Sequence, residues 1–166
     1  MRIAITGSMG VGKTTLAKQI SNATGIRLLP EVARELIKAG HKLDEQATPE
    51  LEEAMAECQQ ELENSFGSWV ADRCLFDILA YTMVLFPKNE TLIHTINRCI
   101  SKAKYGIILY IPPEFPIKDD GVRSTNKDFQ KKIDDTLKQI LHNVHIIRGS
   151  RKERLKLALK IINENS

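Results

Sequence analysis

The 166-residue sequence has little of what marks secreted, metal-binding or membrane-spanning chains. Its three cysteines, Cys58, Cys74 and Cys99, form no CxxC pair and have no histidines nearby at metal-ligand spacing. An odd, scattered set of this kind disfavours a disulfide scaffold or a zinc site, so we expect reduced packing residues. Hydrophobic content of 42% and charged content of 27% are ordinary globular values. Composition therefore suggests neither disorder nor a membrane span.

Leader, linker and repeat signals are also missing. A strand is predicted from residue 2, which leaves no room for a charged and then apolar leader, so we expect a cytoplasmic protein. Without a Pro/Gly/Ser-rich boundary, the length predicts a single domain over residues 1–166. A net charge of +3 is too mild to indicate nucleic-acid binding, although it suits a pocket for phosphorylated ligands.

Short apolar runs alternate with helical stretches along the whole chain. The runs at 2–6, 26–30, 68–72, 106–111 and 144–148 predict strands, and the first and fourth are apolar throughout, as in central parallel strands. Helical spacing or composition covers 13–23, 31–39, 49–65, 75–86, 89–104, 127–141 and 151–162. This alternation predicts an α/β fold with a parallel sheet and crossover helices.

The segment GSMGVGKTT lies between the first strand and the first helix. Residues 7–14 match the G-x-x-x-x-G-K-[ST] pattern of a phosphate-binding loop. Glycines let consecutive N–H groups turn inward toward an anion, and the following helix adds its positive N-terminal end. We expect the triphosphate of ATP to be bound by this set: Gly7, Gly10, Val11, Gly12, Lys13, Thr14 and Thr15.

Two residues of the loop have predicted chemistry. Lys13 is expected to be catalytic, neutralising charge as the γ-phosphoryl group leaves, and the Thr14 hydroxyl is expected to ligate Mg²⁺. A GTPase would carry an Asn-Lys-x-Asp guanine site after a late strand, but Asn126-Lys127-Asp128 lacks that spacing and precedes a helix. The sequence thus predicts a purine nucleoside triphosphate without indicating a GTPase.

Glu31 and Arg34 follow the second predicted strand, one helical turn apart. Ligands in open parallel sheets bind beyond the carboxyl ends of the strands, so both side chains are candidates for the acceptor site. Glu31 could accept or orient the proton of an attacking hydroxyl, and Arg34 could hold a phosphate or sugar oxygen. The alternative is a surface salt bridge between the two.

Asp72-Arg73 ends the third predicted strand. This is where phosphate-loop proteins place the carboxylate that holds Mg²⁺, which makes Asp72 a metal and catalytic candidate. Arg73 is a candidate for acceptor contact, as is Asp77 on the following helix. The alternative for Asp72 is an N-cap of helix 75–86, and for Asp77 a structural role.

Two later segments complete the predicted site. The polar loop IKDDGVRS, within a predicted lid at about 112–127, brings Arg123 to the transferred phosphoryl group, unless it is an ordinary surface loop. Arg151, after the fifth strand, could stack on adenine, although an N-cap at Ser150 explains the segment as well. The six glutamates of 49–65 are expected on a solvated helix face.

The segments GSMGVGKTT, PEVARE, ADRCLFD and DDGVR, in this order, resemble the small P-loop kinases of the thymidylate-kinase-like and AAA-type group. The resemblance is strongest to the ribosylnicotinamide kinase domain of NAD-salvage proteins and to phage-type kinases. It implies a three-layer P-loop NTPase fold with a five-stranded parallel sheet of order 2-3-1-4-5, a lid, ATP and Mg²⁺ as donor, and a nucleoside or nucleotide acceptor.

Our hypothesis is therefore a nucleoside or nucleoside monophosphate kinase that acts without a membrane. Two alternatives stay open at this point. One is a kinase for a polynucleotide hydroxyl or a modified base in DNA, and the other is a regulatory ATPase without a small-molecule acceptor. The identity of the acceptor and the oligomeric state do not follow from these residues.

Overall fold

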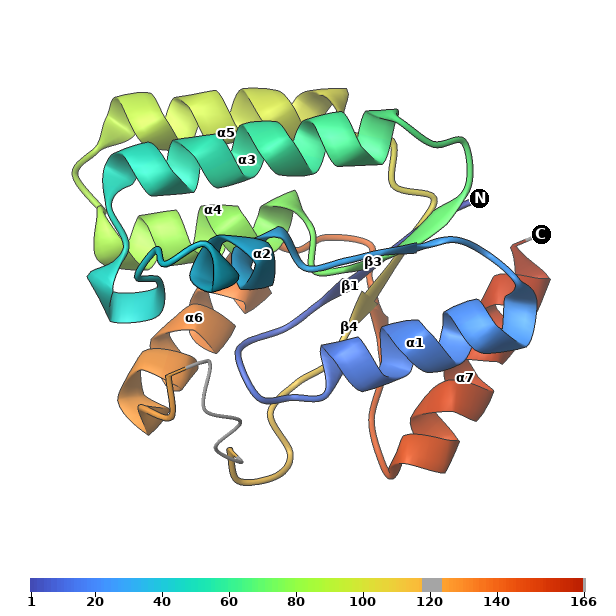
Figure 1. Ribbon diagram of the computed structural model, residues 1–166. Coiled ribbons are helices and arrows are strands. Elements are labelled where there is room, and N and C mark those ends of the chain that lie inside the picture. The colour runs from blue at the N-terminus through green and yellow to red at the C-terminus, as the bar shows by residue number, and fades with distance from the viewer. Residues whose placement is uncertain (118–123, 166) are drawn as a thin grey trace.

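The sheet has the predicted parallel topology. The computed structural model describes residues 1–117 and 124–165, and Figure 1 shows the chain. Its strands are β1 (Arg2–Thr6), β2 (Leu28–Leu29), β3 (Trp69–Asp72), β4 (Ile107–Tyr110) and β5 (His145–Ile146). They pair in the order β2-β3-β1-β4-β5, and every pairing is parallel. The predicted strand order is confirmed.

Helices cover both faces of this sheet. They are α1 (Lys13–Thr24), α2 (Val32–Lys38), α3 (Pro49–Asn64), α4 (Leu75–Leu85), α5 (Glu90–Lys102), α6 (Lys127–Ile140) and α7 (Arg151–Glu164), with a short 3₁₀ helix η1 (Asp44–Gln46). On one face, α1 and α7 pack together against the central strands. On the other, α3, α4 and α6 lie over the sheet, with α5 packed on α3 and α4 (Figure 1). The molecule is thus a three-layer α/β/α structure.

Burial explains which strands are long. Ile3 and Ile5 of β1 are fully buried between the helix layers, and so is Leu109 of β4. The edge strands β2 and β5 have only two residues each, shorter than the predicted 26–30 and 144–148. Both residues of β5 are exposed, whereas Leu29 of the other edge strand is buried. The edge-strand lengths were therefore wrong.

Local capping signals fix several helix starts. The Thr48 side chain accepts the Leu51 N–H, with Pro49 at the first helical position. Ser150 forms a capping box with Glu153 at the start of α7, as the N-cap alternative predicted. None of the described helices has the length and apolarity needed to cross a membrane.

Two expectations need correction. The α3 acids are not all on a solvated face, because Glu52 and Glu63 are buried on the side that α3 turns inward. Packing against α4 and the sheet decides this, and composition cannot show it. Among the cysteines, Cys74 and Cys99 are buried as expected but Cys58 is exposed, and all three are free thiols.

Candidate active site

The phosphate-binding loop joins the end of β1 to the start of α1. Gly12 has φ +97° and is the N-cap of α1, and Gly7 has φ +149°. A Cβ at Gly7 would lie 2.4 Å from the Ile111 carbonyl oxygen, so no side chain fits there. The loop thus has the tight backbone that the glycine pattern predicts for close approach to an anion.

Lys13 lies buried within its own loop. Its Nζ donates hydrogen bonds to the carbonyl oxygens of Gly7 at 2.6 Å and Ser8 at 2.7 Å. The pKa of Lys13 is lowered to about 8, mainly by burial and also by the Arg73 cation, against the opposing effect of the Asp77 and Glu31 charges. These bonds hold the ammonium group at the loop, where it can turn to a bound phosphate.

The loop opens on a large cleft of about 710 Å³. Such a volume is within the usual range for small-molecule sites. The residues that border it come from the loop and α1, from the end of β2, and from the segments after β4 and β5. They include Gly10, Val11, Gly12, Lys13, Thr14, Thr15, Glu31, Arg34, Arg73, Phe115 and Arg151. We call this the donor cleft. Arg151 borders it from the first turn of α7.

Asp72 and Thr14 meet beside the loop. Asp72 is buried at the end of β3, and its carboxylate accepts a hydrogen bond from the Thr14 side chain. Burial raises the pKa of Asp72, and the Glu31 charge raises it further. Within the described part of the chain, Oδ1 of Asp72 has no hydrogen-bond partner. Helix α4 is capped by Cys74, so Asp72 is not its N-cap.

Glu31 lies between two arginines. Its Oε2 contacts Arg34 Nε at 2.8 Å, and its Oε1 contacts Arg73 Nε at 2.5 Å. The predicted Glu31–Arg34 salt bridge is present, but Glu31 itself is buried and also pairs with Arg73, the residue after β3. The bridge is therefore part of the site and not a pair on the surface.

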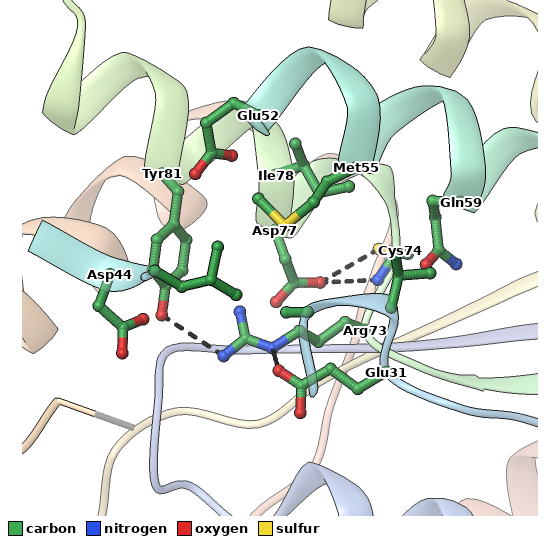
Figure 2. A pocket seen from close by; sticks show the side chains of 13 residues that line it. Glu31, Asp44, Glu52, Met55, Gln59, Arg73, Cys74, Asp77, Ile78 and Tyr81 are labelled. Carbon is green, nitrogen blue, oxygen red and sulfur yellow. Dashed lines mark hydrogen bonds and ion pairs between the residues drawn. The ribbon is translucent and has the colours of Figure 1, made fainter. Parts of the chain in front are cut away.

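Arg73 has an unusual backbone. Its φ of 79° places a bulky residue in the left-handed region, where such strain is concentrated at functional sites. The guanidinium lies over the Tyr81 ring, 5.1 Å from its centroid, and Nη2 lies 3.4 Å from the hydroxyl oxygen. Figure 2 shows the Glu31, Arg73 and Tyr81 side chains in contact. Together they hold the cation in one position.

A second, inner pocket begins at this point. Glu31 and Arg73 border both it and the donor cleft. The remaining lining comes from α2, η1, α3 and α4, and includes Asp44, Glu52, Met55, Gln59, Asp77 and Ile78 (Figure 2). Its open volume of about 30 Å³ holds roughly one water molecule. A larger ligand would require lining side chains such as the flexible Met55 to move.

Asp77 joins the inner pocket to the phosphate-binding loop. Its Oδ1 accepts the Gly7 N–H at 3.3 Å, and its Oδ2 accepts the Cys74 N–H at 2.9 Å. With Cys74 it forms the capping box of α4. The structural role that was the alternative for Asp77 is thus present, and the carboxylate also borders the pocket.

Sequence reasoning missed several pocket residues. Glu52 and Gln59 border the inner pocket from α3. Both share a helix face with Met55 and Ala56, at the i, i+3, i+4, i+7 spacing of a buried stripe. That spacing was the signal that could have found them. Arg123 of the predicted lid is outside the described residues.

Residues 2–154 match the AAA domain family, so the chain belongs to that family. No curated protein sequence matches the chain.

Several solved structures are similar. The NadR protein in complex with NR superposes with a TM-score of 0.82 at 21% identity, covering 98% of this chain and 50% of that one, so this chain spans about half the length of NadR. Deoxyadenosine kinase from M. mycoides, with products dCMP and dCDP bound, gives 0.75 at 16% identity, and each chain is covered in full. Thymidylate kinase from Candida albicans gives 0.69 at 19% identity, covering 98% and 92%. At these identities the likeness shows the fold, which is that of P-loop nucleoside and nucleotide kinases.

Proposed function

We propose that the chain is a kinase that transfers the γ-phosphoryl group of ATP to a nucleoside or nucleoside monophosphate. The observation that carries the proposal is the shared boundary of the two pockets. Glu31 and Arg73 border both the donor cleft and the inner pocket. An acceptor hydroxyl or phosphate in the inner pocket would therefore meet the terminal phosphate of a donor beside an acid and a cation.

The residues present fit a magnesium ion. Asp72 offers a buried oxygen without a hydrogen-bond partner among the described residues, and its carboxylate already contacts the Thr14 hydroxyl. Oxygen ligands of this kind suit Mg²⁺, which commonly binds through one or two protein oxygens plus phosphate. In this proposal Thr14 and Asp72 hold the ion, and the ion neutralises phosphate charge when bound.

Each side chain then has a stated role. Lys13 leaves its carbonyl partners to bind the transferred phosphate, and Glu31 orients the acceptor hydroxyl or accepts its proton. Arg73 and Arg34 hold an oxygen of the acceptor or of the transferred group. Arg123 is proposed to act from the lid and Arg151 to contact the donor base.

The ligands bound in the similar structures support this proposal. NadR is described in complex with NR, and the M. mycoides enzyme with deoxynucleotides. These are small nucleoside-type ligands, and we propose the same class for this chain.

The test is an acceptor panel. Purified protein with MgATP would be given nucleosides, including nicotinamide riboside, then nucleoside monophosphates, then a DNA oligonucleotide, while ADP release and the phosphorylated product are measured. Phosphorylation of a nucleoside or monophosphate is expected. Phosphorylation of the oligonucleotide alone would replace the proposed acceptor, and ADP release that no acceptor stimulates would contradict a kinase.

A further inference from the structure

Two buried side chains donate hydrogen bonds to backbone carbonyl oxygens of the phosphate-binding loop. Gln130 of α6 donates from Nε2 to the Met9 carbonyl oxygen at 2.7 Å, and Arg154 of α7 donates from Nη1 to the Val11 carbonyl oxygen at 2.6 Å. Each side chain lies more than 100 residues away in the sequence from the carbonyl group that it binds. Figure 1 shows α6 and α7 on either side of the loop between β1 and α1.

The anchored carbonyls determine where the next N–H groups point. In a trans peptide the C=O and the following N–H are antiparallel, because the six atoms lie in one plane. A Val11 carbonyl fixed on Arg154 therefore turns the Gly12 N–H to the opposite side, and a Met9 carbonyl fixed on Gln130 does the same for the Gly10 N–H. These are N–H groups of the motif that binds phosphate.

Each anchor is itself held in place. Arg154 is 7% exposed, and its Nη2 contacts Glu114 Oε2 at 2.9 Å. The same Glu114 oxygen accepts the Gly149 N–H at 3.0 Å, which ties the arginine to the turn before α7. Gln130 is 9% exposed, and Met9 packs its side chain into the core that includes α6.

We infer that Gln130 and Arg154 are positioning residues that preorganise the phosphate-binding loop for the donor triphosphate. The inference rests on the proposed function in that the ligand is the triphosphate of the donor. Arg154 borders the donor cleft and Gln130 does not, so Gln130→Glu tests the orientation of the loop without removing a side chain that could contact the ligand. Both residues hold loop carbonyls in place. Their role is to remove the cost of orienting two peptide planes at the moment of binding, which is the source of gain in a preorganised site.

The experiment uses magnesium tripolyphosphate and MgATP as probes for isothermal titration. Gln130→Glu keeps the shape but has no N–H to donate, and Arg154→Met removes both guanidinium contacts. Each is expected to weaken tripolyphosphate binding about tenfold, and the double variant about a hundredfold. Arg154→Lys is expected to be intermediate, since one ammonium cannot replace the planar fork.

Matched controls lie on the same helices. Gln139→Glu adds the same charge at an exposed site of α6, and Lys156→Met makes a comparable change at an exposed site of α7. Both are expected to bind tripolyphosphate like the unchanged protein. Binding as weak as that of the anchor variants would show a general charge or stability effect and overturn the inference.

A spectroscopic signature separates positioning from simple destabilisation. With ¹⁵N-glycine labelling, the Gly10 and Gly12 amide signals should shift strongly on adding tripolyphosphate. The Gln130→Glu and Arg154→Met variants should show a weaker response at the same ligand concentration, while Gly25 and Gly40, outside the loop, keep their signals. If the variants bind tripolyphosphate as tightly as the unchanged protein does, the inference is overturned but the proposed function is not. An unchanged protein that binds neither probe would overturn the proposed function with it.

Discussion

The donor side and the acceptor side of this site are built in different ways. Most of the donor side is one continuous stretch, Gly7–Thr15, whose glycines determine its shape and whose backbone is proposed to bind the triphosphate. The inner pocket is assembled from side chains on α2, η1, α3 and α4. A backbone loop can keep one specificity through many sequences, whereas a side-chain pocket changes with each substitution. This difference explains why the sequence predicts the class of donor but does not predict the acceptor.

The largest expected effect comes from the donor side. Lys13→Met should lower phosphoryl transfer by roughly 10³-fold, because the buried ammonium group is lost where charge develops. Single-turnover assays with MgATP and the best acceptor measure this. Lys18→Met, at an exposed position of α1, is the control and should transfer normally. If the Lys13 variant transfers phosphate at a rate within a few fold of the unchanged protein, Lys13 has no catalytic role.

The next effect should appear on the acceptor side alone. Glu31→Gln keeps an oxygen toward Arg73 but loses the charge, so kcat should fall roughly 10²-fold while MgATP affinity stays within a few fold. Steady-state kinetics and titration together measure the split. The control is Glu35→Gln, because Glu35 forms an exposed salt bridge with Lys38 within α2. A matching loss of MgATP affinity would show that Glu31 serves the donor.

The same contrast decides how much the sequence could predict. The strand order and the tight glycine turn between β1 and α1 depend on local patterns, and the structure contains both. The inner pocket depends on which face of α3 turns inward, and packing against α4 buries Glu52 and Gln59 there. The anchors Gln130 and Arg154 had no sequence signal, because each acts on a loop more than 100 residues away. A local sequence motif therefore does not predict contacts from residues that are distant in the sequence.

Asp77 contacts both the phosphate-binding loop and the inner pocket, so a change there should affect the donor side and the acceptor side together. Asp77→Asn leaves an N–H₂ group where a carboxylate oxygen now accepts either the Gly7 or the Cys74 N–H. We expect a loss of about 2 kcal/mol in the free energy of unfolding, measured by denaturant melts. The control is Asp128→Asn, which changes an exposed acid in the first turn of α6. It should lower the free energy of unfolding by only a few tenths of a kcal/mol. MgATP affinity and acceptor KM should both worsen for Asp77→Asn, because its contacts join the loop to the pocket.

The last prediction concerns a buried acid behind the inner pocket. Oε1 of Glu63 accepts hydrogen bonds from Gln59 at 2.8 Å and from the Tyr105 hydroxyl at 3.0 Å. The pKa of Glu63 is raised from 4.5 to about 7, mainly by burial, because the opposing hydrogen bonds from Gln59 and Tyr105 and the Arg2 charge only partly offset it.

Because the folded state holds this proton more tightly than the unfolded chain, stability is highest below about pH 4.5 for this group and falls as pH rises to about 7. The slope should reach at most about 1.4 kcal/mol per pH unit, measured from denaturant melts across that range. Glu63→Gln should remove this contribution, and Glu61→Gln, an acid of the same helix, should keep it. Identical pH profiles for the two variants would show that Glu63 does not titrate in this range. A flattened profile for Glu63→Gln alone would show that the Glu63 carboxyl, which accepts a hydrogen bond from the pocket residue Gln59, changes its charge near neutral pH.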